Sequence, residues 1–254
     1  METARANGLK MEVFDTYEAM SRAAADLISR ELRQQPSLLL CVSAGGTPTR
    51  AYEMLAARYA RQPKLFDRLR VVQIDEWGGL GRGDPATCAV DLQRKILDPL
   101  GISRERYKGF RTEAADPERE CERLRDWLAA EGPLDVCILG LGKNGHVAMN
   151  EPAEALRPRA HVAVLAASSR RHGMLKDLAK KPRYGLTLGM ADILGSRRVF
   201  LLVSGSSKRA ALRRLMEPQV TTRFPASLLW LHPNATLLCD REAAADFPAC
   251  VLTD

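Results

Sequence analysis

The feature that most constrains the fold is a regular alternation of short apolar runs with helical segments. Each run is about five or six residues long and rich in Val, Leu and Ile, and all but one stop directly at glycine, serine or a carboxylate. The runs span residues 37–42, 69–74, 134–139, 160–165, 198–203 and 235–239. Helical periodicity marks residues 15–34, before the first run, and then residues 48–59, 84–97, 117–130 and 210–215. Such alternation predicts a parallel sheet between two layers of helices. With no linker or repeat, we expect one three-layer, Rossmann-like α/β domain over residues 1–254, with helices on both faces of a mostly parallel sheet.

The loop after the 134–139 run carries the strongest chemical signal. Residues 140–152 read Gly-Leu-Gly-Lys-Asn-Gly-His-Val-Ala-Met-Asn-Glu-Pro. Ligands of parallel α/β sheets bind in the crevice beyond the carboxyl ends of the strands. The imidazole of His146 can move protons there near neutral pH, and the Glu151 carboxylate lies five residues later.

Adjacent carboxylates follow the 69–74 run. Side chains alternate along an extended segment, so Asp75 and Glu76 are expected to point to opposite sides, and only one can face the crevice. The pair is interpreted either as a base aimed into the site or as part of a solvated loop.

Two turns and one basic segment could hold an anion. Residues 43–48, Ser-Ala-Gly-Gly-Thr-Pro, form either a phosphate cradle at a helix start or a plain βα turn. Residues 205–208 repeat this pattern, and Lys208 is either a phosphate ligand or a surface lysine. The segment 168–176 is either an anion site or a solvated basic turn, and its cationic candidates are Arg170, Arg171, His172 and Lys176.

Composition narrows the class of protein. Among 254 residues the hydrophobic share is 46% and the charged share 27%, as in ordinary globular proteins. No apolar run reaches the roughly 20 residues that span a bilayer, and the start lacks a secretory apolar core, so we expect a cytoplasmic protein with no membrane partner. The net charge of +7 is scattered in short pairs, which argues against nucleic acid and suits a phosphorylated small molecule.

Cysteine and histidine spacing predicts no metal site. The cysteines have no paired or clustered spacing, and we expect buried free thiols in a reducing compartment. They are Cys41, Cys88, Cys121, Cys137, Cys239 and Cys250. His161 and His232 are expected to be structural, because nothing near them in the sequence completes a catalytic pair.

Taken together, these motifs resemble a known family. Residues 43–48, 75–77, 140–152, 205–208 and 231–233 occur in the order seen in glucosamine-6-phosphate deaminases and the related 6-phosphogluconolactonases. The Gly-His-x-Ala-x-Asn-Glu-Pro ending separates the deaminases from the lactonases. Within the deaminases, the Lys143-Asn144-Gly145-His146 core looks closest to the galactosamine-6-phosphate deaminase/isomerase group. The resemblance implies a Rossmann-like sheet and an aldose–ketose isomerisation coupled to loss of ammonia, with no metal or organic cofactor.

The resemblance also implies roles for individual residues. Asp75 matches the base that moves a proton from C2 to C1, His146 the residue that assists ring opening, and Glu151 its carboxylate partner. Asn144 takes the place of an aspartate that partners the histidine in the glucosamine enzymes. The expected phosphate contacts are Ser43, Gly45, Gly46, Thr47 and Lys208, with Arg170 or Arg171 or Lys176 in place of the family's arginine, whose position falls at Leu175.

These motifs lead to one expected activity and several alternatives. The expected reaction converts galactosamine 6-phosphate and water to tagatose 6-phosphate and ammonia. The alternatives are a glucosamine-6-phosphate deaminase, a 6-phosphogluconolactonase and a non-catalytic sugar-phosphate sensor. The sequence leaves the preferred epimer and the oligomeric state open, and a homo-oligomer is compatible with it.

Overall fold

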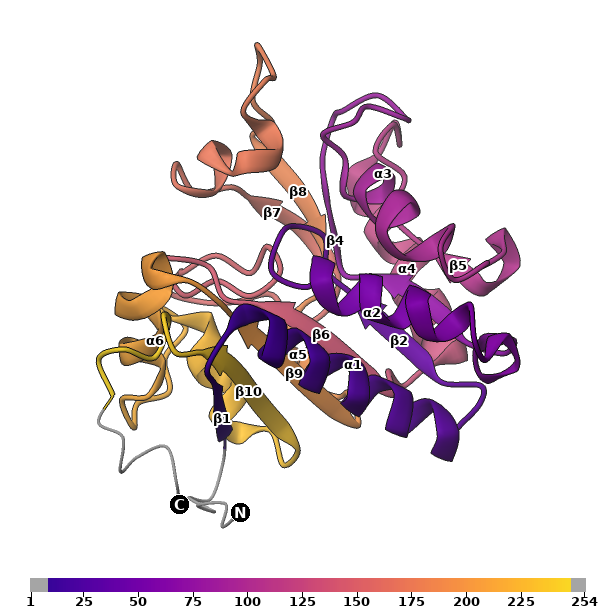
Figure 1. Cartoon of the computed structure of the whole chain (residues 1–254). Coiled ribbons are helices and arrows are strands. Elements are labelled where there is room, and N and C mark those ends of the chain that lie inside the picture. The colour runs from indigo at the N-terminus through magenta and orange to yellow at the C-terminus, as the bar shows by residue number, and fades with distance from the viewer. Residues whose placement is uncertain (1–8, 248–254) are drawn as a thin grey trace.

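The computed structural model describes residues 9–247, in which one large sheet forms the centre of the molecule (Figure 1). Its strand order is β1-β10-β9-β6-β2-β3-β5, and every neighbouring pair is parallel. The strands are β1 (Lys10–Phe14), β2 (Leu39–Val42), β3 (Arg70–Gln73), β5 (Tyr107–Lys108), β6 (Val136–Gly140), β9 (Arg198–Val203) and β10 (Ala235–Asp240). The predicted Rossmann-like architecture is confirmed.

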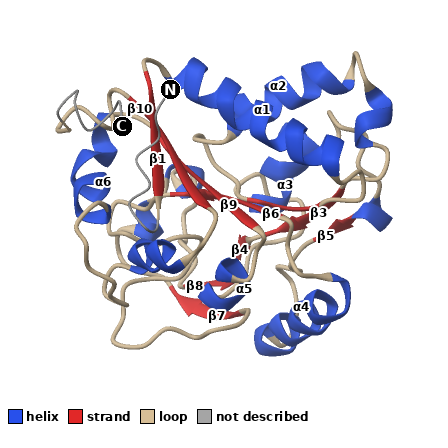
Figure 2. Ribbon diagram, turned by 90° about the horizontal axis from the view of Figure 1, so that it is seen from below, coloured by secondary structure: helices blue, strands red, loops and turns tan. Residues whose placement is uncertain are grey.

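Helices cover both faces of this sheet, as Figure 2 shows from below. The first face carries α1 (Tyr17–Gln34), α2 (Thr49–Tyr59) and α3 (Cys88–Leu92), the last continuing as a π-helical turn over Gln93–Leu97. The opposite face carries α4 (Pro117–Glu131), α5 (Met190–Leu194) and α6 (Arg209–Leu215). Each layer encloses its own apolar core against the sheet. The three predicted layers are therefore present.

A second, antiparallel sheet was not expected from the sequence. It has the order β4-β8-β7, with β4 (Asp75–Trp77), β7 (His161–Val164) and β8 (Tyr184–Thr187). The run at 160–165 therefore belongs to this sheet and not to the parallel one, and residues 184–194 form β8 and α5. The chain leaves the large sheet at Ile74, whose N–H still bonds Val42 while its carbonyl accepts from Leu188.

A capping residue explains why one helix begins later than predicted. The helix expected from Asp84 begins at Cys88, because the Thr87 hydroxyl accepts the N–H of Val90, whereas the Asp84 carboxylate closes a turn with Ala86. The edge strands β1 and β5 lack a strong apolar run and were missed. The remaining helical turns are short and 3₁₀: Pro63–Phe66, Arg104–Arg106, Ser169–Arg171, Gly173–Leu175, Ser206–Lys208 and Pro225–Leu231.

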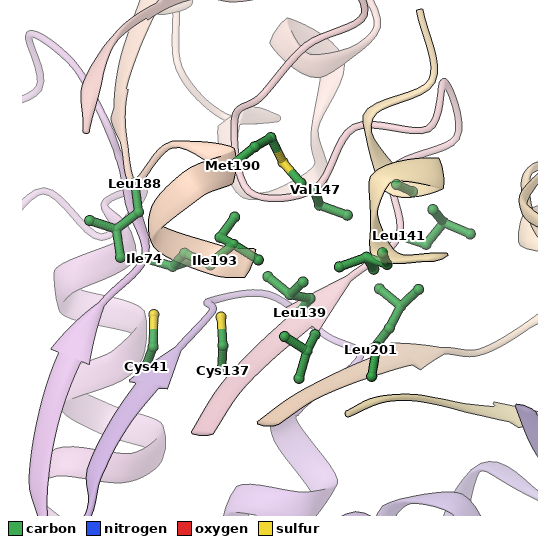
Figure 3. Close-up of a cluster of buried hydrophobic side chains, with 14 of the residues drawn as sticks. Cys41, Ile74, Cys137, Leu139, Leu141, Val147, Leu188, Met190, Ile193 and Leu201 are labelled. Carbon is green, nitrogen blue, oxygen red and sulfur yellow. The ribbon is translucent and has the colours of Figure 1, made fainter. Parts of the chain in front are cut away.

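The strand order places the site. The chain runs outward from β2 to β3 on one side and from β6 to β9 on the other, so β2 and β6 flank the topological switch point. The loops that follow these two strands diverge and leave a crevice between them. Under the loop after β6, Leu139 and Val147 pack among buried apolar side chains that include Met190 and Ile193 (Figure 3). This packing gives the loop a rigid base.

The cysteines in the described part of the chain are free thiols. The thiols are buried and unbridged at Cys41, Cys88, Cys121, Cys137 and Cys239, as predicted, and Cys250 lies outside the described residues. Among the helices between residues 9 and 247, none combines the length and apolarity needed to cross a membrane.

Candidate active site

A cavity of about 610 Å³ opens at the switch point. Its wall is built from the loops after β2 and β6, the 3₁₀ turns of residues 168–174, and the side chains of Asp75 and Lys208. The two carboxyl-end loops and the second sheet thus meet around one hollow. Every motif expected to carry chemistry contributes at least one residue to this wall.

The turn after β2 has the features of an anion-binding site. Gly45 has φ +103°, a conformation that favours glycine, and α2 begins directly after Pro48. The backbone N–H groups of Gly46 and Thr47 donate to no acceptor in residues 9–247. Ser43 also lines the cavity, and within the same range its buried hydroxyl has no hydrogen-bond partner. Unused donors at a helix start are what a phosphate group requires.

The loop after β6 holds a histidine and a carboxylate against each other. His146 Nδ1 lies 3.4 Å from Glu151 Oε2, and the Ser169 hydroxyl lies 3.4 Å from the same nitrogen. The imidazole packs on the bare backbone of Gly142, where a Cβ would come within 2.5 Å of the ring. Ala148, in the same loop, has φ +50°, unusual for a residue with a side chain.

Asn144 supports the carboxylate and not the imidazole. Its Nδ2 donates to Glu151 Oε2 at 2.8 Å, and its Oδ1 accepts the backbone N–H of His146 at 3.2 Å. The amide thus fixes the loop and Glu151, and Glu151 in turn faces the imidazole.

The charge of Glu151 is stabilised in place. Burial acts to raise the pKa of Glu151, but the hydrogen bond and charge of His146, with Ser169 and Asn144, outweigh it and hold the pKa at about 2. A carboxylate next to Nδ1 favours a proton on that nitrogen. Nε2 of His146 is then the nitrogen available to accept a proton from a ligand.

The two carboxylates of β4 point to opposite sides, as alternation predicted. Asp75 lines the cavity, and burial together with the charge of Glu76 raises its pKa to about 7. Glu76 is fully buried and accepts the N–H groups of Trp77, Cys88 and Ala89 at 2.7–2.8 Å. Asp75 is therefore placed for proton transfer near neutral pH, and Glu76 joins β4 to α3.

Only some of the candidate cations reach the cavity. Lys208 reaches it from the turn after β9 and donates to the carbonyl of Leu141 at 2.5 Å. Burial, with the charge of Lys143, lowers the pKa of Lys208. Arg171 lines the wall, whereas Arg170 and Lys176 do not, and Leu175 is buried in an apolar cluster. Of the cations offered in place of the missing arginine, the structure brings only Arg171 to the cavity.

Several wall residues were not singled out as site residues. Trp77 lines the cavity with its ring centroid 5.7 Å from that of His172, and its buried indole N–H has no partner in residues 9–247. Strand alternation could have found Trp77, because it lies two residues beyond Asp75. Lys143 lines the wall as part of the loop after β6, and Cys88 and Ser169 also line it, brought there by the tertiary fold.

Two further histidines lie away from the cavity. His161 and His232 bond the carbonyls of Arg159 and Ser196 and lie outside the cavity wall, as expected for structural residues. Across residues 9–247 no three His, Cys, Asp or Glu side chains are grouped closely enough to hold a metal ion.

Known proteins are similar to this chain in sequence. The family model described as glucosamine-6-phosphate isomerases/6-phosphogluconolactonase matches residues 14–238. The chain is 39% identical to the putative deaminase AgaI of Escherichia coli K12 over 224 residues, covering 88% of this chain and 89% of that protein. It is 33% identical to glucosamine-6-phosphate deaminase 1 of Bacillus subtilis over 239 residues, covering 93% and 99%.

Solved structures agree with these matches. A monomeric glucosamine-6-phosphate deaminase superposes with a TM-score of 0.89 at 32% identity, covering 92% of this chain and 98% of that one. The 6-phosphogluconolactonase of Trypanosoma brucei gives 0.73 at 20% identity over 94% and 98%, which shows a shared fold alone. The chain therefore belongs to the glucosamine-6-phosphate isomerase/6-phosphogluconolactonase family, on its amino-sugar-phosphate deaminase side.

Proposed function

We propose that the protein deaminates and isomerises galactosamine 6-phosphate, giving tagatose 6-phosphate and ammonia. The observation that carries the proposal is the meeting of Asp75, the His146–Glu151 pair and the donor-rich turn of Gly45–Thr47 in one cavity. A 2-amino aldose needs a base at C2, an acid–base group at its ring oxygen, and an anchor for its phosphate. The cavity offers one candidate for each role.

Binding begins at the phosphate. The N–H groups of Gly46 and Thr47, the Ser43 hydroxyl and the Lys208 ammonium are the proposed ligands, with Arg171 on the same wall. This end of the substrate is remote from the reacting carbons, so its binding energy serves to position them.

Ring opening is assigned to His146. Its Nε2 accepts the proton of the C1 hydroxyl and returns a proton to the ring oxygen as the C1–O5 bond breaks. Ionised Glu151, at 3.4 Å from Nδ1, stabilises the imidazolium formed in between.

Asp75 then acts on the open chain. Its carboxylate removes the C2 proton to give an enolamine and delivers that proton to C1. The resulting C2 iminium adds water and expels ammonia, leaving the ketose. With a pKa raised to about 7, Asp75 can both accept and donate this proton near neutral pH.

The choice of the galacto epimer rests on Asn144. The glucosamine enzymes resembled by this chain have an aspartate there, and the galactosamine-type group shares the asparagine. The identity of 39% to a putative deaminase, against 33% to a named glucosamine-6-phosphate deaminase, is compatible with a separate substrate branch.

Ammonia release from purified protein tests the proposal. Galactosamine 6-phosphate and glucosamine 6-phosphate are supplied in parallel, and Asp75→Asn serves as the inactive control. Release from the galacto epimer alone supports the proposal, and release from the gluco epimer alone keeps the reaction and overturns the substrate. If neither releases ammonia, hydrolysis of 6-phosphogluconolactone and ligand binding without turnover decide between a lactonase and a sensor.

A further inference from the structure

A charged pair lies directly behind the phosphate turn, outside the cavity wall. Asp91 belongs to α3 and Lys95 to the π-helical turn that continues it, and Lys95 Nζ lies 2.7 Å from Asp91 Oδ1. Asp91 is 7% exposed. Neither residue lines the cavity, so neither is placed to touch a ligand.

Both members of the pair hold the backbone of a single residue, Gly45. The Gly45 N–H donates to Asp91 Oδ2 at 3.0 Å, and Lys95 Nζ donates to the Gly45 carbonyl at 3.0 Å. A Cβ built at Gly45 would meet nothing within 4 Å, so packing does not impose its φ of +103°. Hydrogen bonds fix it instead: two from the charged pair and one from the Thr49 hydroxyl at 2.7 Å.

This arrangement decides which donors remain free. With the Gly45 N–H directed at Asp91, the next two N–H groups, of Gly46 and Thr47, are left without acceptors in the described chain. A turn held in this state before ligand arrives loses less conformational entropy on binding.

We propose that Asp91 and Lys95 are positioning residues that hold the Gly45–Thr47 turn ready for a phosphomonoester dianion. The inference rests on the proposed function's assignment of this turn to phosphate. It assigns a role to two residues that the sequence places on an ordinary charged helix.

The sign of the effect separates positioning from simple electrostatics. A carboxylate behind an anion site repels the anion, so its removal alone tightens phosphate binding. Loss of the contact to Gly45 frees the turn and weakens binding. In Asp91→Ala the two mechanisms therefore predict opposite changes.

The experiment measures the dissociation constant for inorganic phosphate by NMR titration, together with KM and kcat for the amino-sugar phosphate. In Asp91→Ala we expect phosphate binding and KM to weaken about tenfold, the effect of losing a hydrogen bond to a charged group, with kcat within about threefold of wild type. Asp91→Asn retains an oxygen that can accept the Gly45 N–H, and is expected to recover most of this loss. Phosphate binding in Asp91→Ala as tight as in wild type, or tighter, overturns the proposal.

Two further variants guard the interpretation. Asp98→Asn removes an exposed carboxylate just beyond the same helical segment, bonded to Gln93, and is expected to change neither constant. If Asp91→Ala does not fold, Lys95→Met tests the other contact. It is expected to weaken phosphate binding by a similar factor, and unchanged binding in it overturns the proposal.

Failure of this inference can be distinguished from failure of the proposed function, because phosphate binding is measured without turnover. If the wild-type protein releases ammonia and Asp91→Ala keeps the wild-type affinity for phosphate, the inference alone is wrong. One that binds phosphate, loses it in Asp91→Ala and deaminates nothing sinks the proposed function alone. A wild-type protein that binds no phosphate overturns the inference in either case.

Discussion

Asp75 and Glu76 are consecutive carboxylates with opposite surroundings: Asp75 lines the cavity, and Glu76 is fully buried behind it with three backbone N–H groups as donors. These hydrogen bonds offset part of the cost of burying the Glu76 charge. That charge is one reason why the pKa of Asp75 rises. A structural carboxylate thereby shifts the pKa of the proposed base.

Replacing Asp75 by Asn should abolish most turnover while sparing substrate binding. Loss of a general base typically costs about 10²–10⁴-fold in rate. Ammonia release measures kcat, and a substrate titration by intrinsic fluorescence measures binding. Wild-type turnover in Asp75→Asn would remove Asp75 from the mechanism.

The pH profile of kcat/KM should show an acid limb near pH 7. Asp75 must be ionised to accept the C2 proton, and its pKa of about 7 means that the base form is lost as pH falls through this value. The phosphate group of the substrate ionises at about pH 6, so its contribution is measured separately as the pH dependence of phosphate inhibition. A limb near pH 4, where an ordinary aspartate titrates, would show that the pKa of Asp75 is not raised.

Asp75→Asn should also stabilise the fold at alkaline pH. The pKa is raised from 3.8 to about 7, so the folded state binds more protons than the unfolded state between these values and loses stability as pH rises across them. After a discount for cavity solvent, we expect Asp75→Asn to be more stable by ~1–2 kcal/mol at pH 8. Urea unfolding at pH 8 and pH 3 tests this, since the difference should vanish at the lower pH.

Lys208→Gln should weaken phosphate recognition. A charge-assisted hydrogen bond to phosphate is lost, so KM and the inhibition constant of inorganic phosphate should both rise about 10–100-fold, with a smaller change in kcat. Lys64→Gln, at an exposed lysine of the 63–66 turn, is the matched control. Equal inhibition of Lys208→Gln and wild type by phosphate would place Lys208 outside the binding site.

Asn144→Asp should bring two carboxylates into conflict. The amide that donates to Glu151 at 2.8 Å becomes a like charge, so the pKa of Glu151 should rise and the folded state should lose stability at neutral pH. Repulsion disappears when the pair takes up protons, so the loss relative to wild type should shrink as pH falls below about 4. A pH-independent difference in unfolding free energy would assign the effect to lost hydrogen bonding alone.

Local pattern was enough to find the large sheet and the centre of the site. Apolar runs that end at serine or glycine mark β2, β6 and β9, and the residues just beyond them are those that meet at the switch point. Alternation correctly separated Asp75 from Glu76 because it depends only on strand geometry.

Contacts between residues far apart in the sequence could not be predicted from local patterns. The run at 160–165 looks like any buried strand, and only its pairing with β8 assigns it to the second sheet. Asp91 and Lys95 look like a solvated helical pair, and their contact with Gly45 exists only after α3 docks behind the turn. Arg170 and Arg171 are adjacent and identical, yet only Arg171 reaches the cavity wall, because successive side chains of a 3₁₀ turn point in directions about 120° apart.

The pairing of β4 also bears on how the protein is made. Its ladder partner is β8, which follows much later in the chain, after α4, β6 and β7. During synthesis, the strand that bears Asp75 leaves the ribosome with its hydrogen-bonding edge uncovered and stays so until residues 184–187 emerge. The large-sheet neighbours β2 and β3 can pair before then, so a nascent chain stalled before β8 should lack the strand pairing that places Asp75, the proposed base.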